Sequence, residues 1–385
     1  MSRRLATRRS SSSQFDLVCC AVPFGYGPVS KLLAIVQRTH AAGATAAFVG
    51  SGIAYELAYR SDLFDEVVMG KPEDPATKNI LKAANHVVCV MDPDFTQAAL
   101  QLAQPVSVVD SLFWMWDHIP KPFLDAKHYW VQNFLGVEEQ TAKLPQRPEI
   151  VGPILPRRAS ASGVVGSGGG LLVNLGGCES PYGNAYGMSP YVDFVIESLA
   201  SSTLADVYRQ QTLLIAGQDC IGSVADRLSR LGIKAESLPL QEAETAFQQA
   251  DLVLTSPGLT GTLQAFRSRT PTIFLPPQNY SQWLILSLLR EHGLAPFSFH
   301  WKDALPSDPA PNLMPEPIAV PRVSAAINYL IRCGLVTKDH LAANLSSMLQ
   351  LDLKDLSLRQ QQAFASWSVN DGASVIAEAT TGAFS

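Results

Sequence analysis

The sequence has few charged residues and lacks any long apolar run. Only 16% of its 385 residues are charged, and 29 Lys and Arg against 34 Asp and Glu give a formal charge of -5. This mild acidity provides no electrostatic footprint for binding nucleic acid. No stretch of about 18 apolar residues is present, which excludes a membrane-spanning helix. Hydrophobic residues make up 47% of the chain, so it is too apolar to be disordered, and its length predicts two domains.

The sequence also lacks the patterns of a disulfide framework or a structural metal site. Its six cysteines form no CxxC pair, and its seven histidines are scattered. Cys19, Cys20 and Cys89 lie within apolar runs, where a free thiol behaves as a small hydrophobic side chain. No apolar segment of a secretory signal is present. We therefore expect a reduced, cytoplasmic protein that has no metal held by its own side chains.

Changes in composition divide the chain into five segments. Residues 1–14 are rich in Arg and Ser and lack acids, which favours a disordered tail, with a transit peptide as the alternative. Residues 156–170 are rich in Gly and Ser, as in a flexible linker. We expect an α/β domain on each side of this linker, at 15–155 and 171–320, and a helical segment at 321–385.

Short apolar runs alternate with segments of helical periodicity in both halves. This alternation predicts βαβ units, and hence two doubly wound, Rossmann-like parallel sheets. A ligand is then expected in the cleft between the domains, near the carboxyl ends of the strands. The expected strands are 15–22, 44–49, 66–69, 86–91 and 106–109 in the first half, and 171–175, 212–216, 251–255 and 272–275 in the second.

The loop after the first strand contains Gly25, Tyr26 and Gly27, with Lys31 shortly after them. It is a near match to the dinucleotide GxGxxG motif, but Ser30 replaces the third glycine and no acidic residue ends the second strand. We favour a tight turn that presents backbone N–H groups to the cleft. A plain connecting turn is the alternative. For Lys31 we favour a solvated helix lysine, and the alternative is binding of a donor phosphate or a sugar carboxylate.

A second loop predicts a phosphate site at the start of a helix. The strand 251–255 is followed by Ser256, Gly258 and Leu259, and then by Thr260, Gly261 and Thr262. Glycines allow close approach to the backbone, and a helix N-terminus attracts anions. The alternative is ordinary capping of the helix by Ser256 or Thr260.

Gln278 and Gln282 follow the next strand along the chain. Neutral amides can bind a ribose or the edge of a pyrimidine by paired hydrogen bonds. A polar start to a helix is the alternative, but the place of this segment directly after the phosphate motif favours ligand binding.

Together these motifs resemble the nucleotide-sugar half of GT-B glycosyltransferases, most closely the family of the peptidoglycan N-acetylglucosaminyltransferase. The resemblance is specific over residues 171–295 and architectural over the first domain. It implies that the Ser256–Thr262 motif holds the donor diphosphate and that Gln278 and Gln282 contact the nucleoside. Gly176 and Gly177 look like the other phosphate-facing loop of that family.

The sequence departs from that family at two positions. Gln264 stands where the family usually has a glutamate that binds the ribose hydroxyls, and an amide bonds a hydroxyl more weakly than a carboxylate does. Pro28 stands where the family often has an acceptor-side histidine. The usual general base is therefore missing from its usual place.

The segment 108–120 offers replacements for that base. We expect Asp110, at a strand end, to be the general base, with His118 as the second candidate because its ordinary pKa suits proton transfer. Trp114 and Trp116 suit a flat acceptor such as a nucleobase, and a hydrophobic plug between domains is the alternative. The segments around Trp114, at 129–133 and at 174–177 are also faintly similar to cytosylglucuronate synthases, which join cytosine to glucuronate from UDP-glucuronate.

The resulting hypothesis is a glycosyltransferase that moves a sugar from a nucleotide diphosphate donor to a small soluble acceptor. The resemblance implies a uridine-based donor, inversion at the anomeric carbon and no cofactor. Asp92 and Asp94 form a DxD pair, but they lie far along the chain from the nucleotide motifs, and metal binding is the less favoured interpretation. The alternatives are a nucleotide-sugar hydrolase or epimerase, a non-catalytic nucleotide-binding partner, and a disfavoured NAD oxidoreductase.

Overall fold

The structure, a computed structural model, describes residues 15–145, 147–158, 169–176, 178, 189–208 and 210–382. The expected tail at 1–14 and residues 159–168 of the expected linker lie outside this set.

The first domain is built on a parallel sheet of seven strands in the order β3-β2-β1-β4-β5-β6-β7. Its central strands are buried on both faces, which explains why they read as continuous apolar runs. The strands are β1 (Phe15–Ala21), β2 (Ala46–Gly50), β3 (Glu66–Met69), β4 (Ala84–Val90), β5 (Val106–Asp110), β6 (His128–Gln132) and β7 (Glu149–Val151). The helices between them are α1 (Gly27–Ala41), α2 (Gly52–Arg60), α3 (Pro75–Lys82), α4 (Pro93–Gln101), η1 (Phe113–Met115), α5 (Lys121–Leu124) and α6 (Val137–Thr141).

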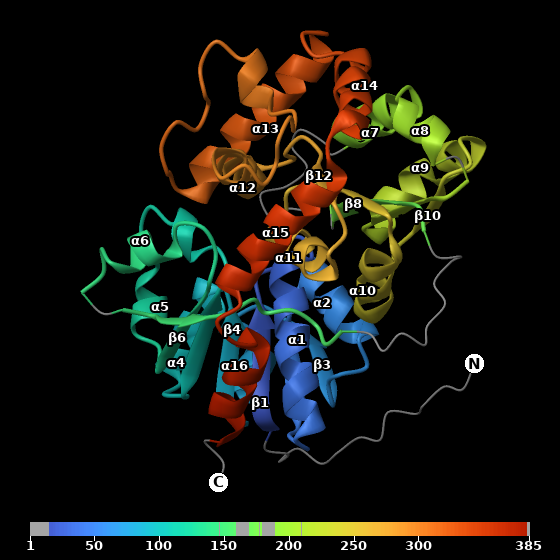
Figure 1. Cartoon of the computed structure of the whole chain (residues 1–385). Helices are drawn as coiled ribbons and strands as arrows, with labels where there is room; N and C mark the ends of the chain where they lie inside the picture. The colour runs from blue at the N-terminus through green and yellow to red at the C-terminus, as the bar shows by residue number, and fades with distance from the viewer. Residues whose placement is uncertain are drawn as a thin grey trace, which may run out of the picture.

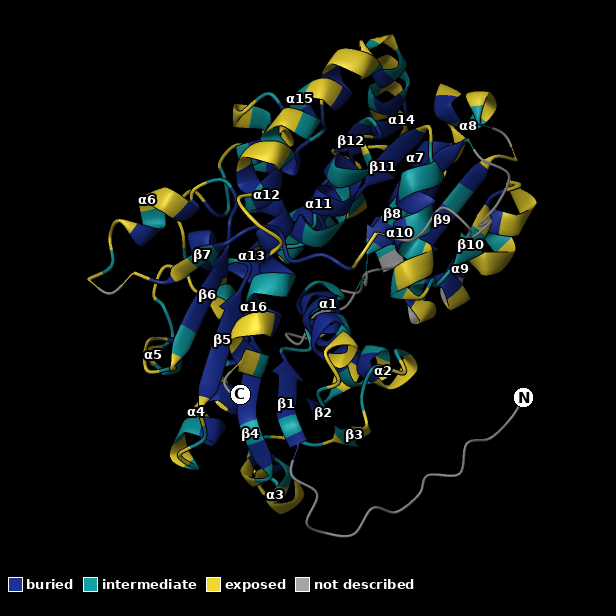
Figure 2. Cartoon of the chain, turned by 60° about the horizontal axis from the view of Figure 1, so that its bottom comes forward, coloured by how far each residue is buried: buried dark blue, intermediate teal, exposed yellow. Residues whose placement is uncertain are grey.

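The second domain repeats this plan with a parallel sheet of five strands in the order β10-β9-β8-β11-β12. Figure 2 shows the strands of both sheets as largely buried. The strands are β8 (Leu171–Gly176), β9 (Thr212–Ala216), β10 (Lys234–Glu236), β11 (Leu252–Thr255) and β12 (Thr272–Phe274). The helices are α7 (Ser189–Ala200), α8 (Thr203–Val207), α9 (Gln218–Arg230), α10 (Leu240–Gln249), α11 (Leu259–Ser268), α12 (Tyr280–Glu291) and η2 (Trp301–Ala304).

The C-terminal helices divide between the two domains. The helices α13 (Glu316–Arg332) and α14 (Lys338–Ser347) pack on α7, and α15 (Leu353–Trp367) packs on α11. A short turn, η3 (Met348–Gln350), joins α14 to α15. The last helix, α16 (Gly372–Thr381), returns to the first domain and lies against α1, as Figure 1 shows. The described residues of this C-terminal segment are mainly helical, and its last helix contributes Ala373, Ile376 and Ala377 to the core of the first domain.

The return of α16 is fixed by one ion pair and by close backbone packing. Asp371 caps α16 and pairs with Arg38 of α1 at 2.9 Å. A Cβ atom on Gly372 would lie 2.2 Å from the carbonyl oxygen of Gly152, and one on Gly152 would lie 2.0 Å from that of Asn370. The two segments that leave the first domain, one after β7 and one before α16, therefore touch each other at glycines.

Both doubly wound sheets were expected from the sequence, and the fold class is confirmed. The strands β6, β7 and β10 were not anticipated. Among the described residues, no helix combines the length and apolar character needed to cross a membrane.

Candidate functional site

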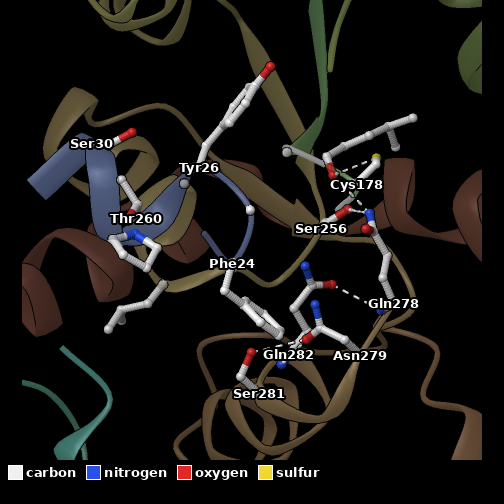
Figure 3. A pocket seen from close by; sticks show the side chains of 18 of the residues that line it. Phe24, Tyr26, Ser30, Cys178, Ser256, Thr260, Gln278, Asn279, Ser281 and Gln282 are labelled. Atoms are coloured by element: carbon white, nitrogen blue, oxygen red, sulfur yellow. Dashed lines mark hydrogen bonds between the residues drawn. The ribbon is translucent and has the colours of Figure 1, made fainter. Parts of the chain in front are cut away.

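A cavity of about 270 Å³ lies between the two domains. Its walls include the end of β9 and the loops that follow β1, β5, β8, β11 and β12, so both sheets present their carboxyl ends to it. The strand order reverses between β1 and β4 in the first sheet and between β8 and β11 in the second. Such reversal points leave a crevice in which α/β proteins bind ligands. Figure 3 shows the polar side chains of Ser256, Gln278, Asn279 and Gln282 gathered along one wall.

The N-terminus of α11 opens into this cavity without a side-chain cap. Its N-cap residue is Gly258, which has extended backbone angles and no side chain to accept from the first turn. The hydroxyl of Ser256 instead accepts a hydrogen bond from Nε2 of Gln278 at 2.5 Å. The alternative interpretation, ordinary capping by Ser256 or Thr260, is therefore wrong. The N–H groups of the first turn and the positive end of the helix dipole are left to attract an anion.

Of the remaining motif residues, three face the cavity and one bonds within the helix. Leu259, Thr260 and Gly261 line the cavity. Gly261 is required for packing, because a Cβ atom there would lie 2.8 Å from Nδ2 of Asn174 on β8. Thr262 does not line the cavity, and its hydroxyl donates to the carbonyl oxygen of Gly258 at 2.9 Å.

The glycine loop of the first domain faces α11 across the cavity. Gly25 has a φ of 55°, a conformation that favours glycine, and Gly25, Tyr26 and Gly27 all line the cavity. The interpretation as a plain connecting turn is therefore incomplete. A Cβ atom on Gly27 would lie 3.6 Å from Oγ1 of Thr260, which places the N-termini of α1 and α11 against each other.

Lys31 connects these two helix starts. Its side chain is 1% exposed, and Nζ donates to Oγ1 of Thr260 at 2.5 Å across 229 residues of sequence. Burial lowers the pKa of this amine from 10.5 to about 7. The interpretation as a solvated helix lysine is therefore wrong. The sequence placed Lys31 on the acceptor side, but the structure places its amine against the first turn of α11.

Replacing Lys31 with methionine is expected to increase the free energy of unfolding at pH 7 by about 1–4 kcal/mol, because a buried amine paired only with a hydroxyl is costly. The unfolded chain keeps this proton up to pH 10.5, whereas the folded chain releases it near pH 7. The stability of the wild type relative to the variant should therefore rise between these two pH values. Urea unfolding of both proteins at pH 7 and pH 9.5 measures the difference between their free energies of unfolding at each pH. A variant less stable than wild type at pH 7 would contradict this account.

The amides of Gln278 and Gln282 organise the opposite wall. Nε2 of Gln278 donates to the carbonyl oxygen of Leu175 at 2.9 Å, in addition to its bond with Ser256. Oε1 of Gln282 accepts from the backbone N–H of Gln278 at 2.9 Å. Nε2 of Gln282 lies 3.9 Å from the Cβ position of Gly258. Gln278 therefore ties together the ends of β8 and β11, and Gln282 places a donor beside the phosphate-site helix.

Gln264 has a buried carboxylate as its neighbour. Its Nε2 donates to Oε2 of Glu244 on α10 at 3.3 Å, and the same carboxylate pairs with Arg267 at 2.6 Å. An ionised carboxylate can only accept, so the amide must turn its nitrogen towards Glu244 and keep its oxygen for another partner. Gln264 lines the cavity, and its Oε1 can accept from a hydroxyl there. The carboxylate of Glu244, on the neighbouring helix α10, therefore fixes the orientation of the Gln264 amide.

Asp110 is fully buried and does not line the cavity. Its carboxylate accepts hydrogen bonds from the indole of Trp116 at 2.7 Å, the hydroxyl of Tyr129 at 2.8 Å and the N–H of Leu112 at 2.9 Å. Burial raises its pKa to about 6, although these donors oppose the shift. In this arrangement Asp110 holds Trp116, which does line the cavity, and has no direct path to an acceptor.

The other two candidates of this segment also lie away from the cavity. The side chain of His118 is 89% exposed and pairs with Asp117 at 3.0 Å. Trp114 is buried and packs on the ring of Phe134 at 5.7 Å. The hydrophobic-plug interpretation therefore describes Trp114, whereas Trp116 takes part in the site.

Solved structures resemble this chain over nearly its whole length. MurG of Acinetobacter baumannii matches with a TM-score of 0.53 and 13% identity, over 95% of this chain and 99% of that one. UGT2 of Phytolacca americana, complexed with UDP-2-fluoro-glucose and pterostilbene, matches with a TM-score of 0.54 and 12% identity, over 96% and 100%. The complex of S. aureus MnaA with UDP matches with a TM-score of 0.55 and 11% identity, over 95% and 96%. The chain has the GT-B fold. No protein-family model matches it, and no curated protein matches it in sequence.

The expected residues of this GT-B site are mostly brought together. Those that line the cavity come from both domains, and Gly177 lies outside the described residues. The residues that line it are Gly25, Tyr26, Gly27, Lys31, Trp116, Gly176, Ser256, Gly258, Leu259, Thr260, Gly261, Gln264, Gln278 and Gln282.

The DxD pair lies outside the GT-B cavity. Asp92 is buried and caps α4 by accepting from the N–H of Phe95 at 3.0 Å, whereas Asp94 is exposed. Burial raises the pKa of Asp92 to about 6. Within the described ranges, no three His, Cys, Asp or Glu side chains are grouped so that they could hold a metal ion.

Sequence reasoning missed one end of the cavity and one apolar wall. Glu316, Ser324 and Asn328 of α13 contribute polar groups at that end, and Leu238 and Phe247 contribute to the apolar wall. No local motif marks these positions, since α13 follows the last strand by about 40 residues and reaches the site only through the tertiary fold. Leu238 and Phe247 are apolar residues with no glycine motif beside them, and Pro239 between them indicates only the start of α10.

Proposed function

We propose that this protein is a glycosyltransferase that uses a nucleotide diphosphate sugar as its donor and a small soluble molecule as its acceptor. One observation carries the proposal. The uncapped N-terminus of α11, the buried amine of Lys31 and the amides of Gln264, Gln278 and Gln282 converge on a single cavity between the two domains.

The donor diphosphate would lie on the first turn of α11. Backbone N–H groups of Leu259, Thr260 and Gly261 and the hydroxyl of Thr260 would bond its oxygens and stabilise the charge that develops on the departing diphosphate. The apolar wall at Leu238 and Phe247 suits a nucleobase. Oε1 of Gln264 would accept a hydrogen bond from a ribose hydroxyl.

The acceptor would enter from the first domain, between the glycine loop and Trp116. Its nucleophilic atom would displace the diphosphate at the anomeric carbon in one step, with inversion. Glu316 is the one acidic side chain among the described cavity-lining residues, so it is our first candidate for the proton acceptor. Asp110 would act through Trp116 by fixing the position of the indole.

The specific substrates proposed rest on sequence resemblance. They are a uridine-based donor, with UDP-glucuronate and cytosine as the first donor and acceptor pair to test. A hydrolase or epimerase acting on the same donor would use the same cavity without a second substrate.

A thermal-shift panel tests the donor site. It uses UDP, UDP-glucuronate, UDP-N-acetylglucosamine, dTDP-glucose, GDP-mannose and NAD, each with and without magnesium. A ligand at about 100 times its Kd stabilises a protein by about 2.7 kcal/mol, enough for a shift of a few degrees. We expect a shift with a uridine ligand that does not need magnesium. Cooperative unfolding without any nucleotide shift would overturn the proposal.

Turnover assays then separate the activities. Release of UDP that depends on an added acceptor supports a transferase, and release without one indicates a hydrolase. Interconversion of the sugar without release of UDP indicates an epimerase. Binding without turnover of any kind would identify a non-catalytic nucleotide-binding protein.

A further inference from the structure

Lys31 is the one cationic side chain among the described residues that line the cavity. A diphosphate ester carries two negative charges, and α11 alone supplies a partial positive charge of about one half. If one of the described lining side chains supplies further positive charge to such a ligand, that side chain is Lys31.

Among the described residues, Lys31 lacks the carboxylate partner that a buried cation normally has. Buried ammonium groups are usually paired with carboxylates, because the loss of hydration must be offset. None of the ion pairs found among the described residues includes Lys31. Its hydrogen bond goes to the neutral hydroxyl of Thr260, so two of the three donors on Nζ are left for an anion.

The position of Lys31 determines which anion it can meet. Thr260 lies in the first turn of α11, where the free N–H groups and the helix dipole already favour phosphate. Gly27, one turn earlier on α1, has no side chain to fill the space beside Thr260. An anion bound at the start of α11 would therefore lie within reach of the amine from the other domain.

We propose that Lys31 is the cation that binds the donor diphosphate, taking the electrostatic role that a divalent metal has in other transferases. It exchanges the hydroxyl of Thr260 for a phosphate oxygen when the donor enters. Because the amine belongs to the first domain and the helix to the second, the diphosphate meets both positive charges only when the domains are held as in this structure. This inference rests on the proposed function and specifies the ligand of the same site.

Calorimetric titration of three proteins tests this role. Wild type, Lys31→Met and the matched control Lys78→Met, at an exposed position of α3, are each titrated with uridine, UDP, UDP-glucose and UDP-glucuronate. All titrations are repeated in EDTA. We expect Lys31→Met to weaken UDP and both UDP-sugars by about 10- to 100-fold, the effect of losing a charge-assisted hydrogen bond. Uridine affinity should change by less than about twofold, and Lys78→Met should match wild type throughout.

A Thr260→Val variant provides a second readout. It removes one neutral donor to the diphosphate but keeps the amine of Lys31, so it should lower the preference for UDP over uridine by less than Lys31→Met does. Unfolding curves for all variants confirm that each is folded under the conditions of the titration.

The outcomes separate this inference from the proposed function. No binding of any nucleotide to wild type would overturn the proposed function itself. Equal affinity of wild type and Lys31→Met for UDP would overturn only the role of Lys31. Weakening confined to UDP-glucuronate would assign the lysine to the sugar carboxylate instead. Loss of wild-type binding in EDTA would show that a metal supplies the charge, and this would also overturn the inference.

Discussion

A Gly258→Leu variant is expected to fold normally and to lose at least about 100-fold in nucleotide affinity, equivalent to about 2.7 kcal/mol. Gly258 has a φ of −77° and a ψ of 138°, which any residue can adopt. The nearest heavy atom to its Cβ position is Nε2 of Gln282 at 3.9 Å, so a Cβ atom fits there without displacing the backbone. It would occupy the space in which we place the diphosphate. Titration with UDP, together with a thermal melt, measures both parts of this expectation.

Two other glycines show whether the effect is specific. Gly222→Leu on α9 places the same side chain where no atom lies within 4 Å of the Cβ position, and it should leave affinity unchanged. Gly261→Ala meets Asn174 at 2.8 Å and should lower the melting temperature. Unchanged UDP affinity in Gly258→Leu would show that the nucleotide binds elsewhere.

Of the variants proposed here, Glu244→Ala is expected to lower the free energy of unfolding the most. The side chains of Glu244 and Arg267 are 1% and 12% exposed, and their ion pair spans 2.6 Å. Breaking a buried pair by removing one partner costs about 3–5 kcal/mol, because the remaining charge is left uncompensated. Glu244→Ala also deprives Gln264 and Gln248 of their acceptor. Chemical denaturation of the variant and wild type measures the loss.

The control for this prediction is an ion pair of similar length on the surface. Glu197 pairs with Arg227 at 2.6 Å, but both side chains are about a third or more exposed. Glu197→Ala should cost less than about 1 kcal/mol, because water screens such a pair. Equal losses in the two variants would mean that burial does not determine the strength of the Glu244 pair.

The sheet architecture could be read from the sequence because parallel strands buried on both faces leave continuous apolar runs. The runs at 86–91 and 251–255 correspond closely to β4 and β11. The strands that were missed are short or lie towards the edge of a sheet. β10 and β7 have three residues each, and β10 begins and ends with charged side chains, Lys234 and Glu236. These segments form strands because they pair with β6 and β9, and their own composition does not indicate a strand.

The junction between β11 and α11 was predictable because its glycines and threonines are adjacent in the sequence. The burial of Lys31 was not, because it depends on α11, more than 200 residues away. Asp110 was chosen because strand ends usually point into a cleft. Trp116 and Tyr129 fold over its carboxylate instead, and only the packing of β6 against β5 brings Tyr129 there.

Because α16 returns to the first domain, the chain passes between the two domains twice, once after β7 and once before α16. The first domain is therefore discontinuous in sequence, and residues 15–155 expressed alone would leave uncovered the face of α1 on which Ala373 and Ile376 pack. The two crossings touch where Gly152 meets Asn370 and Gly372. The two covalent links between the halves therefore run side by side through one junction, and every other contact between the halves is non-covalent among the described residues.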